Sequence, residues 1–136
     1  MDVTKMLEQD HRTVEGLFSQ FESSGDHEIV EEICNELEVH ASVEEELVYP
    51  KLAEFDPELE QHAEEEHGEM KSLIAQLRSG SGDTMALVDR LKSTVQDHVE
   101  EEESQAFPEL RERLGDELQR IGQAAQERKR ELTAQR

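Results

Sequence analysis

One pattern occurs twice in this chain, and it limits the folds that the rest of the sequence can adopt. Residues 40–50 and residues 98–108 both begin with a histidine, carry a glutamate four positions later and end in an aromatic residue followed by proline. Residues four apart lie on one face of an α-helix, with Cβ atoms about 5–6 Å apart. Each copy therefore places an imidazole and a carboxylate on the same helix face. We interpret the two copies as two halves of one metal site.

Apolar residues at helical spacing predict an all-α chain. The serine- and glycine-rich segments 23–26 and 79–82 are expected to be loops, and Pro50 and Pro108 are expected to end the helices that precede them. The expected helices cover about residues 3–21, 27–48, 57–78 and 84–107, each with a single apolar stripe. A further polar helix after Gly115 is expected to lie across the others or to fray from them, and it shows no chemistry of its own.

The duplication extends beyond the repeated pattern. When His11 is aligned with His67, the apolar positions that follow the two histidines coincide. The chain is therefore read as two helical hairpins, each with a histidine on both helices. Two such hairpins joined by short connections predict an antiparallel, up-down-up-down four-helix bundle. We assign residues 1–114 to the bundle and residues 115–136 to a C-terminal helical extension.

Six side chains that can bind metal lie on the apolar stripes: His11, His40, Glu44, His67, His98 and Glu102. A single buried histidine is more often a hydrogen-bonded structural residue than a ligand. A buried carboxylate without a partner, however, costs several kcal/mol. Six such groups around one axis need a cation to neutralise and coordinate them, so the pattern favours a metal centre over a metal-free polar core.

The number and type of donors restrict the metal. Four imidazoles and two carboxylates exceed a tetrahedral structural zinc site, and they contain too much nitrogen for calcium or magnesium. Two shared carboxylates with two histidines per ion describe a dinuclear site, and this ligation suits iron, manganese or zinc. With a bridging oxygen, each ion keeps one open position at which a small molecule can bind.

The charge excludes other classes of partner. The formal net charge of -21 argues against binding to nucleic acid or to an anionic membrane, because both need basic patches. Adaptation to high salt would give the same charge balance. The chain has no apolar run long enough to span a bilayer and no apolar leader segment, so we expect a cytoplasmic protein. The sequence gives no indication of its oligomeric state.

These motifs, taken in order, resemble the hemerythrin-like, or HHE cation-binding, family. The residues that carry the resemblance are Asp10-His11-Arg12, His40-x-x-x-Glu44-Glu45, Glu66-His67 and His98-x-x-x-Glu102-Glu103. The resemblance implies a non-heme centre of two iron ions with an oxo or hydroxo bridge. It also implies that His11 and His40 serve one iron, that His67 and His98 serve the other, and that Glu44 and Glu102 bridge them.

The chain departs from the oxygen-carrying members of that family at Ala63, where they have a second histidine. His62 lies about 140° around the helix from His67, so it is a further metal ligand only if that helix is distorted, and otherwise a surface or supporting residue. Glu45 and Glu103 fall off the apolar stripes and are expected to be solvated, the alternative being that they support the neighbouring metal ligands. Tyr49 offers a phenol that could lie near the metal, but it is expected to pack at a helix end, because Phe107 holds the matching place in the other half.

The resemblance leaves several functions open. The first hypothesis is a protein that binds O2 or a related ligand such as nitric oxide, for sensing, carriage or scavenging. The second is a di-iron enzyme with peroxide-decomposing, catalase-like or other redox activity. A third is iron or metal homeostasis, and a bundle that holds zinc without redox chemistry completes the alternatives.

Overall fold

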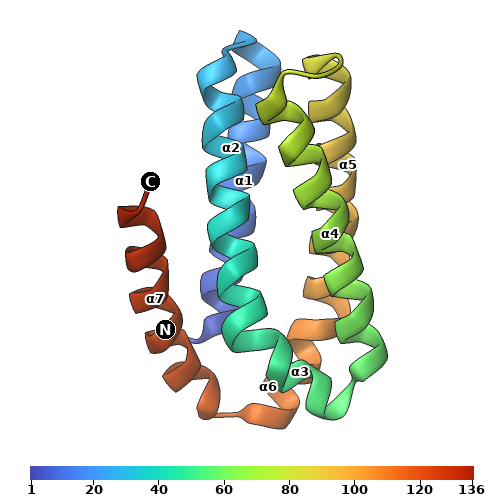
Figure 1. Ribbon diagram of the computed structural model, residues 1–136. Helices are drawn as coiled ribbons and strands as arrows, with labels where there is room; N and C mark the ends of the chain where they lie inside the picture. Colours follow the sequence, from blue (N-terminus) through green and yellow to red (C-terminus); the bar gives the residue numbers. More distant parts are fainter.

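The computed structural model describes all 136 residues and contains helices but no strands. The α-helices are α1 (Val3–Ser24), α2 (His27–Val43), α3 (Tyr49–Phe55), α4 (Pro57–Ser79), α5 (Thr84–Glu101), α6 (Phe107–Leu114) and α7 (Glu117–Ala134). Figure 1 shows the four long helices α1, α2, α4 and α5 side by side as a bundle, with α7 lying along the outside of the α1–α2 pair. None of the helices combines the length and the apolar character that crossing a membrane requires.

The ends of the long helices follow from local side-chain chemistry. Asp26, Asp56 and Asp83 are the N-caps of α2, α4 and α5, and each accepts a hydrogen bond from a backbone N–H in the first turn of its helix. Gly25 and Gly80 end α1 and α4 with φ of 68° and 73°, a left-handed conformation that glycine adopts without strain. The expected loops therefore lie where the sequence predicts them.

The two repeated prolines do not end their helices, so this expectation is wrong. Pro50 and Pro108 lie in the first turn of α3 and α6, where a residue without an N–H is tolerated. Each follows a single π-helical turn, η1 (Glu44–Val48) or η2 (Glu102–Ala106), which connects it to the preceding long helix. Both π turns begin at the glutamate of the repeated pattern. Such turns occur frequently at functional sites.

Two apolar clusters enclose the middle of the bundle. One contains Val14 and Phe21 together with residues of α2, α4 and α5. The other contains Leu7 and Phe107 with residues of η1, α3, α6 and α7. His11 lies between Leu7 and Val14 on α1, so the polar side chains of the bundle interior are located between two hydrophobic layers that keep water out.

The C-terminal helix is packed against the bundle and does not fray. α7 contacts α1 and α2 and buries Leu118, Gly122 and Ala125. The sequence left open whether this helix lies against the others or frays from them, and in the structure it lies against them.

Gly122→Ala is expected to loosen this packing. A Cβ atom on Gly122 would lie 1.9 Å from the carbonyl oxygen of Met1, so either α7 or the N-terminus has to move. We expect a loss of about 1–3 kcal/mol in the free energy of unfolding, measured by chemical denaturation. Gly16→Ala is the matched control: its Cβ meets nothing within 4 Å, and it should stabilise α1 by about 0.5–1 kcal/mol. Equal stability of Gly122→Ala and the parent would show that this contact does not hold α7.

Candidate metal centre

The six candidate ligands converge inside the bundle. All six are buried, with the histidines coming from α1, α2, α4 and α5 and the glutamates from the first positions of η1 and η2. They form two groups in which the donor atoms lie within 4.8 Å of one another: His11 with His40 and Glu102, and Glu44 with His67 and His98. We call these the first and the second triad.

Each glutamate faces histidines of both triads. The two oxygens of Glu102 divide between them, because Oε1 lies 3.1 Å from His11 Nε2 and Oε2 lies 3.2 Å from His98 Nε2. Glu44 Oε1 lies 3.2 Å from His40 Nε2 and 3.1 Å from His67 Nε2. A carboxylate shared between two cations needs this arrangement.

The site has donor atoms that the protein alone does not satisfy. Glu44 Oε2 is buried and has no hydrogen-bond partner, and His40 Nε2, although it lies 3.2 Å from Glu44 Oε1, forms no hydrogen bond in this geometry. A buried polar atom without a partner costs about 1–3 kcal/mol, and a cation between the triads would engage both atoms. The nitrogen and carboxylate donors are those that iron, manganese and zinc accept. The residues present therefore fit a pair of such ions.

A carboxylate also lies at the outer nitrogen of every triad histidine. The Nδ1 pairs are His11 with Glu103 (2.8 Å), His40 with Asp10 (3.0 Å), His67 with Glu45 (2.8 Å) and His98 with Glu66 (2.7 Å). Such partners fix the orientation of the imidazole, direct Nε2 inward and increase its basicity. The two halves match, since one acid follows each shared glutamate and another precedes the first histidine of each hairpin.

The expectation that Glu45 and Glu103 are solvated is therefore wrong. Their side chains are 29% and 26% exposed, and each reaches from the edge of its helix face to an imidazole. Asp10 and Glu66 also face imidazoles of the triads, and the periodicity did not single them out. The signal for all four was their place in the sequence, directly beside a candidate ligand.

Tyr49 has more than the packing role expected for it. Its hydroxyl donates to Glu102 Oε2 at 2.9 Å, and the same oxygen lies 3.3 Å from Glu44 Oε1 and 3.0 Å from His67 Nε2. Burial, followed by the charges of Glu102 and Glu44, raises the pKa of Tyr49 well above its ordinary value, so the phenol stays protonated at neutral pH. Phe107, in the matching place, stacks on His11 instead. The aromatic pair thus supplies one hydroxyl to the centre.

The neighbouring carboxylates favour the charged form of His40 and His98 when no metal competes. Burial by itself lowers the pKa of His40, but Glu44 and Asp10 outweigh burial and raise the pKa to about 10. The pKa of His98 is likewise raised well above its ordinary value, against burial, chiefly by Glu102. Burial opposes the ionised form of Glu44 as well, yet His40 holds the pKa of this carboxyl well below its ordinary value.

Metal binding is therefore expected to release protons. Because the pKa of His40 is about 10, its imidazole is protonated at pH 7.5 and has to lose a proton before Nε2 can bind a cation. The affinity for zinc should rise as the pH increases toward 10 and fall as the solution is acidified. Calorimetric titration of the metal-free protein in two buffers of different ionisation enthalpy counts the protons. Release of none at pH 7.5 would contradict the prediction, and His62→Ala should leave the number unchanged.

His62 does not join the two triads. Its side chain is 53% exposed, and its Nδ1 lies 2.7 Å from Glu101 Oε1. α4 passes through this position as a regular helix, so no distortion turns His62 inward. Together with Glu66 and Glu101 it forms a separate group on the outside of the bundle.

The C-terminal helix contributes to the surroundings of the centre, contrary to expectation. Lys129 Nζ on α7 donates to Asp10 Oδ1 at 2.6 Å, and the other oxygen of Asp10 faces His40. The preceding residue, Arg128, pairs with Glu46 within η1 at 2.7 Å.

Comparison with known proteins places these features in context. The model of the hemerythrin HHE cation binding domain matches residues 2–110. A protein of Nostoc sp. named DNA nickase is 33% identical over 125 residues, which are 86% of this chain and 36% of that protein. An uncharacterized hemerythrin-like protein of Schizosaccharomyces pombe is 26% identical over 126 residues, or 85% of this chain and 62% of that protein. The chain thus spans less than two thirds of either relative. No solved structure matches.

Proposed function

The chain belongs to the hemerythrin HHE cation-binding domain family, and from this we propose that it is a non-heme di-iron protein that binds O2 or a related small ligand such as nitric oxide. His11 and His40 hold one ion, His67 and His98 hold the other, and the two glutamates are shared, inside an antiparallel up-down-up-down bundle. The observation that carries the proposal is that Glu102 divides its two oxygens between the triads.

The residues of the chain prepare the centre for this task. When bound, two iron ions would supply an open position for a small ligand and a change of redox state. The outer carboxylates hold the imidazoles in place, and the buried rings of Phe107 and Tyr49 exclude water. The hydroxyl of Tyr49 offers a hydrogen bond to a ligand that enters between the triads. O2, nitric oxide or peroxide would then bind reversibly for sensing, carriage or scavenging.

A peroxide-decomposing enzyme is the second candidate, and Tyr49 favours it. A phenol that remains protonated beside the centre can act as a hydrogen-bond or proton donor to a departing oxygen atom. If this is the function, Tyr49→Phe should lose peroxide turnover while it keeps its metal. Iron homeostasis receives less support, because a site for two ions offers little storage capacity.

The decisive experiment is the metal content of the purified protein together with its absorption spectrum. Two iron ions per chain, with near-ultraviolet bands that change reversibly on reduction and exposure to O2 or nitric oxide, would support the ligand-binding function. Catalytic loss of peroxide would instead support the function of a peroxide-decomposing enzyme. Two zinc ions, or a stable fold without metal, would overturn the di-iron proposal.

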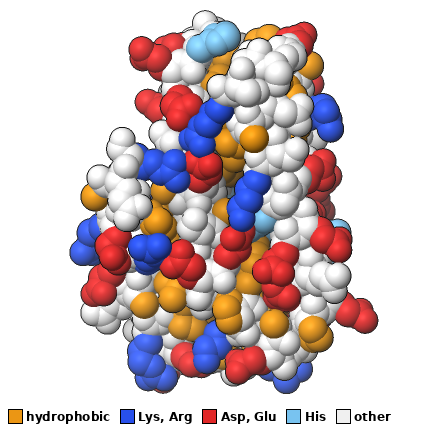
Figure 2. All heavy atoms as spheres, in the orientation of Figure 1, with side chains coloured by type: hydrophobic (Ala, Val, Ile, Leu, Met, Phe, Trp, Pro, Cys, Tyr) orange, Lys and Arg blue, Asp and Glu red, His pale blue; other side chains and the backbone are white.

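Because one relative is named DNA nickase, a separate experiment tests whether this chain acts on DNA. We propose that this chain does not act on DNA, because its net charge of -21 repels the phosphate backbone. On the face shown in Figure 2, acidic side chains stand beside the basic ones across the surface. Metal-loaded protein incubated with supercoiled plasmid should leave it supercoiled. Conversion to the open circular form would overturn this and point to phosphodiester hydrolysis.

A further inference from the structure

The outer carboxylates of the centre are not all held in the same way. Glu103 pairs with Arg12, Glu45 accepts from Lys71 Nζ at 2.8 Å, and Asp10 accepts from Lys129 Nζ at 2.6 Å. Glu66, which corresponds to Asp10 in the other hairpin, forms its ion pair with His98 and has no lysine or arginine partner. The duplicated halves therefore differ in how the second carboxylate is fixed.

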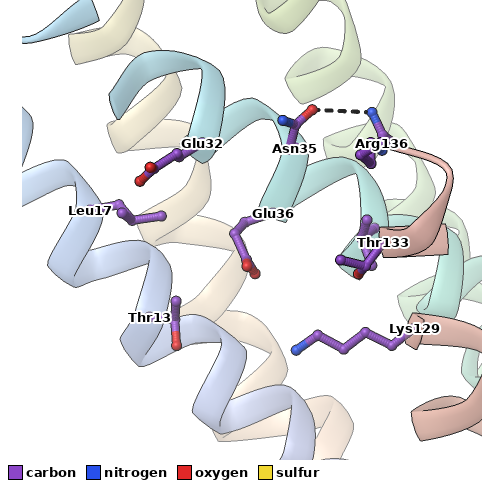
Figure 3. Close-up of a pocket in the computed structure, with 9 residues that line it drawn as sticks. Thr13, Leu17, Glu32, Asn35, Glu36, Lys129, Thr133 and Arg136 are labelled. Carbon is purple, nitrogen blue, oxygen red and sulfur yellow. Dashed lines mark hydrogen bonds between the residues drawn. The ribbon is translucent and has the colours of Figure 1, made fainter. Parts of the chain in front are cut away.

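The difference arises from α7. The cations at Glu103 and Glu45 come from α1 and α4, which are bundle helices, whereas Lys129 comes from a helix outside the matched residues 2–110. α7 packs on the first hairpin, and the second hairpin has no counterpart. Figure 3 shows Lys129 extending from α7 across a crevice of about 280 Å³ between α1, α2 and α7.

The contact fixes the orientation of a buried carboxylate. The Asp10 side chain is 7% exposed, and its two oxygens have different partners: Oδ1 accepts from Lys129, and Oδ2 lies 3.0 Å from His40 Nδ1. With Oδ1 held, Oδ2 stays directed at the imidazole, and the imidazole keeps Nε2 directed at the interior of the site. Without Lys129, Asp10 loses its only lysine or arginine partner and becomes free to turn away from His40.

We propose that Lys129 is a positioning residue for the first triad, acting through Asp10 on His40, so that docking of α7 controls how firmly one of the two ions is held. This inference rests on the proposed dinuclear centre. It makes the C-terminal helix a control element for that centre, since whatever displaces α7 also releases the carboxylate that orients His40.

The alternative is that Lys129 merely anchors α7 to the bundle. The variant Arg136→Met distinguishes this alternative from the positioning role. Arg136 also joins α7 to the bundle, at 2.7 Å from Glu38 of α2, and its side chain is as exposed as that of Lys129 (both 34%). It contacts none of the carboxylates that face the triad histidines. Lys129→Met and Arg136→Met thus remove comparable anchors, but Lys129→Met alone disturbs Asp10.

The test measures release of cobalt(II) to a chelator from the loaded full chain, together with the visible absorption of the bound ions. Loss of an outer partner of a metal-bound histidine costs about 10–100-fold in affinity. Lys129→Met should therefore lose one ion about 10-fold faster and change part of the spectrum, Lys129→Arg should restore both, and Arg136→Met should match the parent. Lys71→Met should instead accelerate the release of the other ion, because Lys71 contacts Glu45 and Glu45 faces His67.

Each other result counts against a specific statement. Equal behaviour of Lys129→Met and Arg136→Met, or equal acceleration of both ions in Lys129→Met, would overturn the positioning role while leaving the metal centre intact. A parent protein that binds fewer than two ions would overturn the proposed centre, and the inference with it.

Discussion

Glu102→Ala is expected to lose both metal ions, although it removes a single ligand. Its two oxygens face one histidine of each triad, at 3.1 Å and 3.2 Å, so neither ion keeps a complete set of donors without it. Changes to residues that only support a ligand cost about 10–100-fold in metal affinity, and loss of a shared ligand should exceed that. We expect the metal content, measured by mass spectrometry after gel filtration, to fall from two ions per chain to below one.

Two further variants serve as controls for the metal content of Glu102→Ala. His67→Ala removes a ligand of one triad and should keep part of the metal, whereas His62→Ala lies outside both triads and should keep all of it. If Glu102→Ala retained one full equivalent, Glu102 would serve a single ion and the shared role would be wrong. Far-ultraviolet circular dichroism should confirm that each variant remains helical.

Removal of the metal is expected to produce the largest loss of stability. A ligand that binds only the folded state stabilises it by about 4 kcal/mol when its free concentration is 1,000 times the dissociation constant, and two ions add their contributions. Without them, Glu44 Oε2 is buried without a partner, and His40 Nε2 forms no hydrogen bond. For a chain of this size, each kcal/mol shifts the melting temperature by about 2–5 °C, so chelation should lower it by more than 10 °C.

The measurement is a pair of calorimetric melts, one of the loaded protein and one after dialysis against a chelator. Adding iron or zinc back should restore the higher melting temperature, which separates metal loss from irreversible damage. Identical melting temperatures would contradict a buried centre. Lys51→Met removes an ion pair between α3 and α7 that involves no triad residue, and it should show the same difference between the two melts as the parent.

The sequence predicted which side chains meet inside the bundle because one periodicity holds along α1, α2, α4 and α5. Histidines such as His11 and His98 stood on apolar stripes, and the repeated pattern placed a glutamate on the same face as two of the histidines. Regular α-helical spacing holds up to Glu44 and Glu102, and the six side chains that it directed inward are buried close together. Their role as metal ligands stays a prediction.

Beyond Glu44 and Glu102 the same reasoning failed, because the helix changes its geometry there. A helical stripe of 3.6 residues per turn puts Glu45 off the buried face, and it treats Pro50 as the end of the helix. The π turn between them widens the helix and allows a new α segment to begin with proline. Sequence periodicity contains no signal for a single π turn.

A place for Tyr49 near the metal was considered and set aside for a different reason. Phe107 holds the matching place in the other half of the chain, and its side chain has no polar atom. Comparison of the two halves therefore favoured a role that both rings can perform. The structure shows that the two aromatic residues have diverged within the same scaffold, since one stacks on His11 and the other donates to Glu102. Similarity between halves predicts shared packing, but it does not predict where the halves differ.

Because of the π turns, the site depends on the number of residues between the shared glutamate and the aromatic residue that follows it. A π turn closes with an i→i+5 bond, and the N–H of Tyr49 donates to the carbonyl of Glu44. Because the turn holds one extra residue, deleting one residue between them would let an ordinary i→i+4 bond close instead, and the later side chains would keep nearly the same direction. Inserting one more residue would instead rotate every later side chain by about 100°. The hydroxyl of Tyr49 would then leave the centre although no residue that contacts it had been replaced. The spacing between Glu44 and Tyr49 therefore tolerates substitution better than it tolerates insertion.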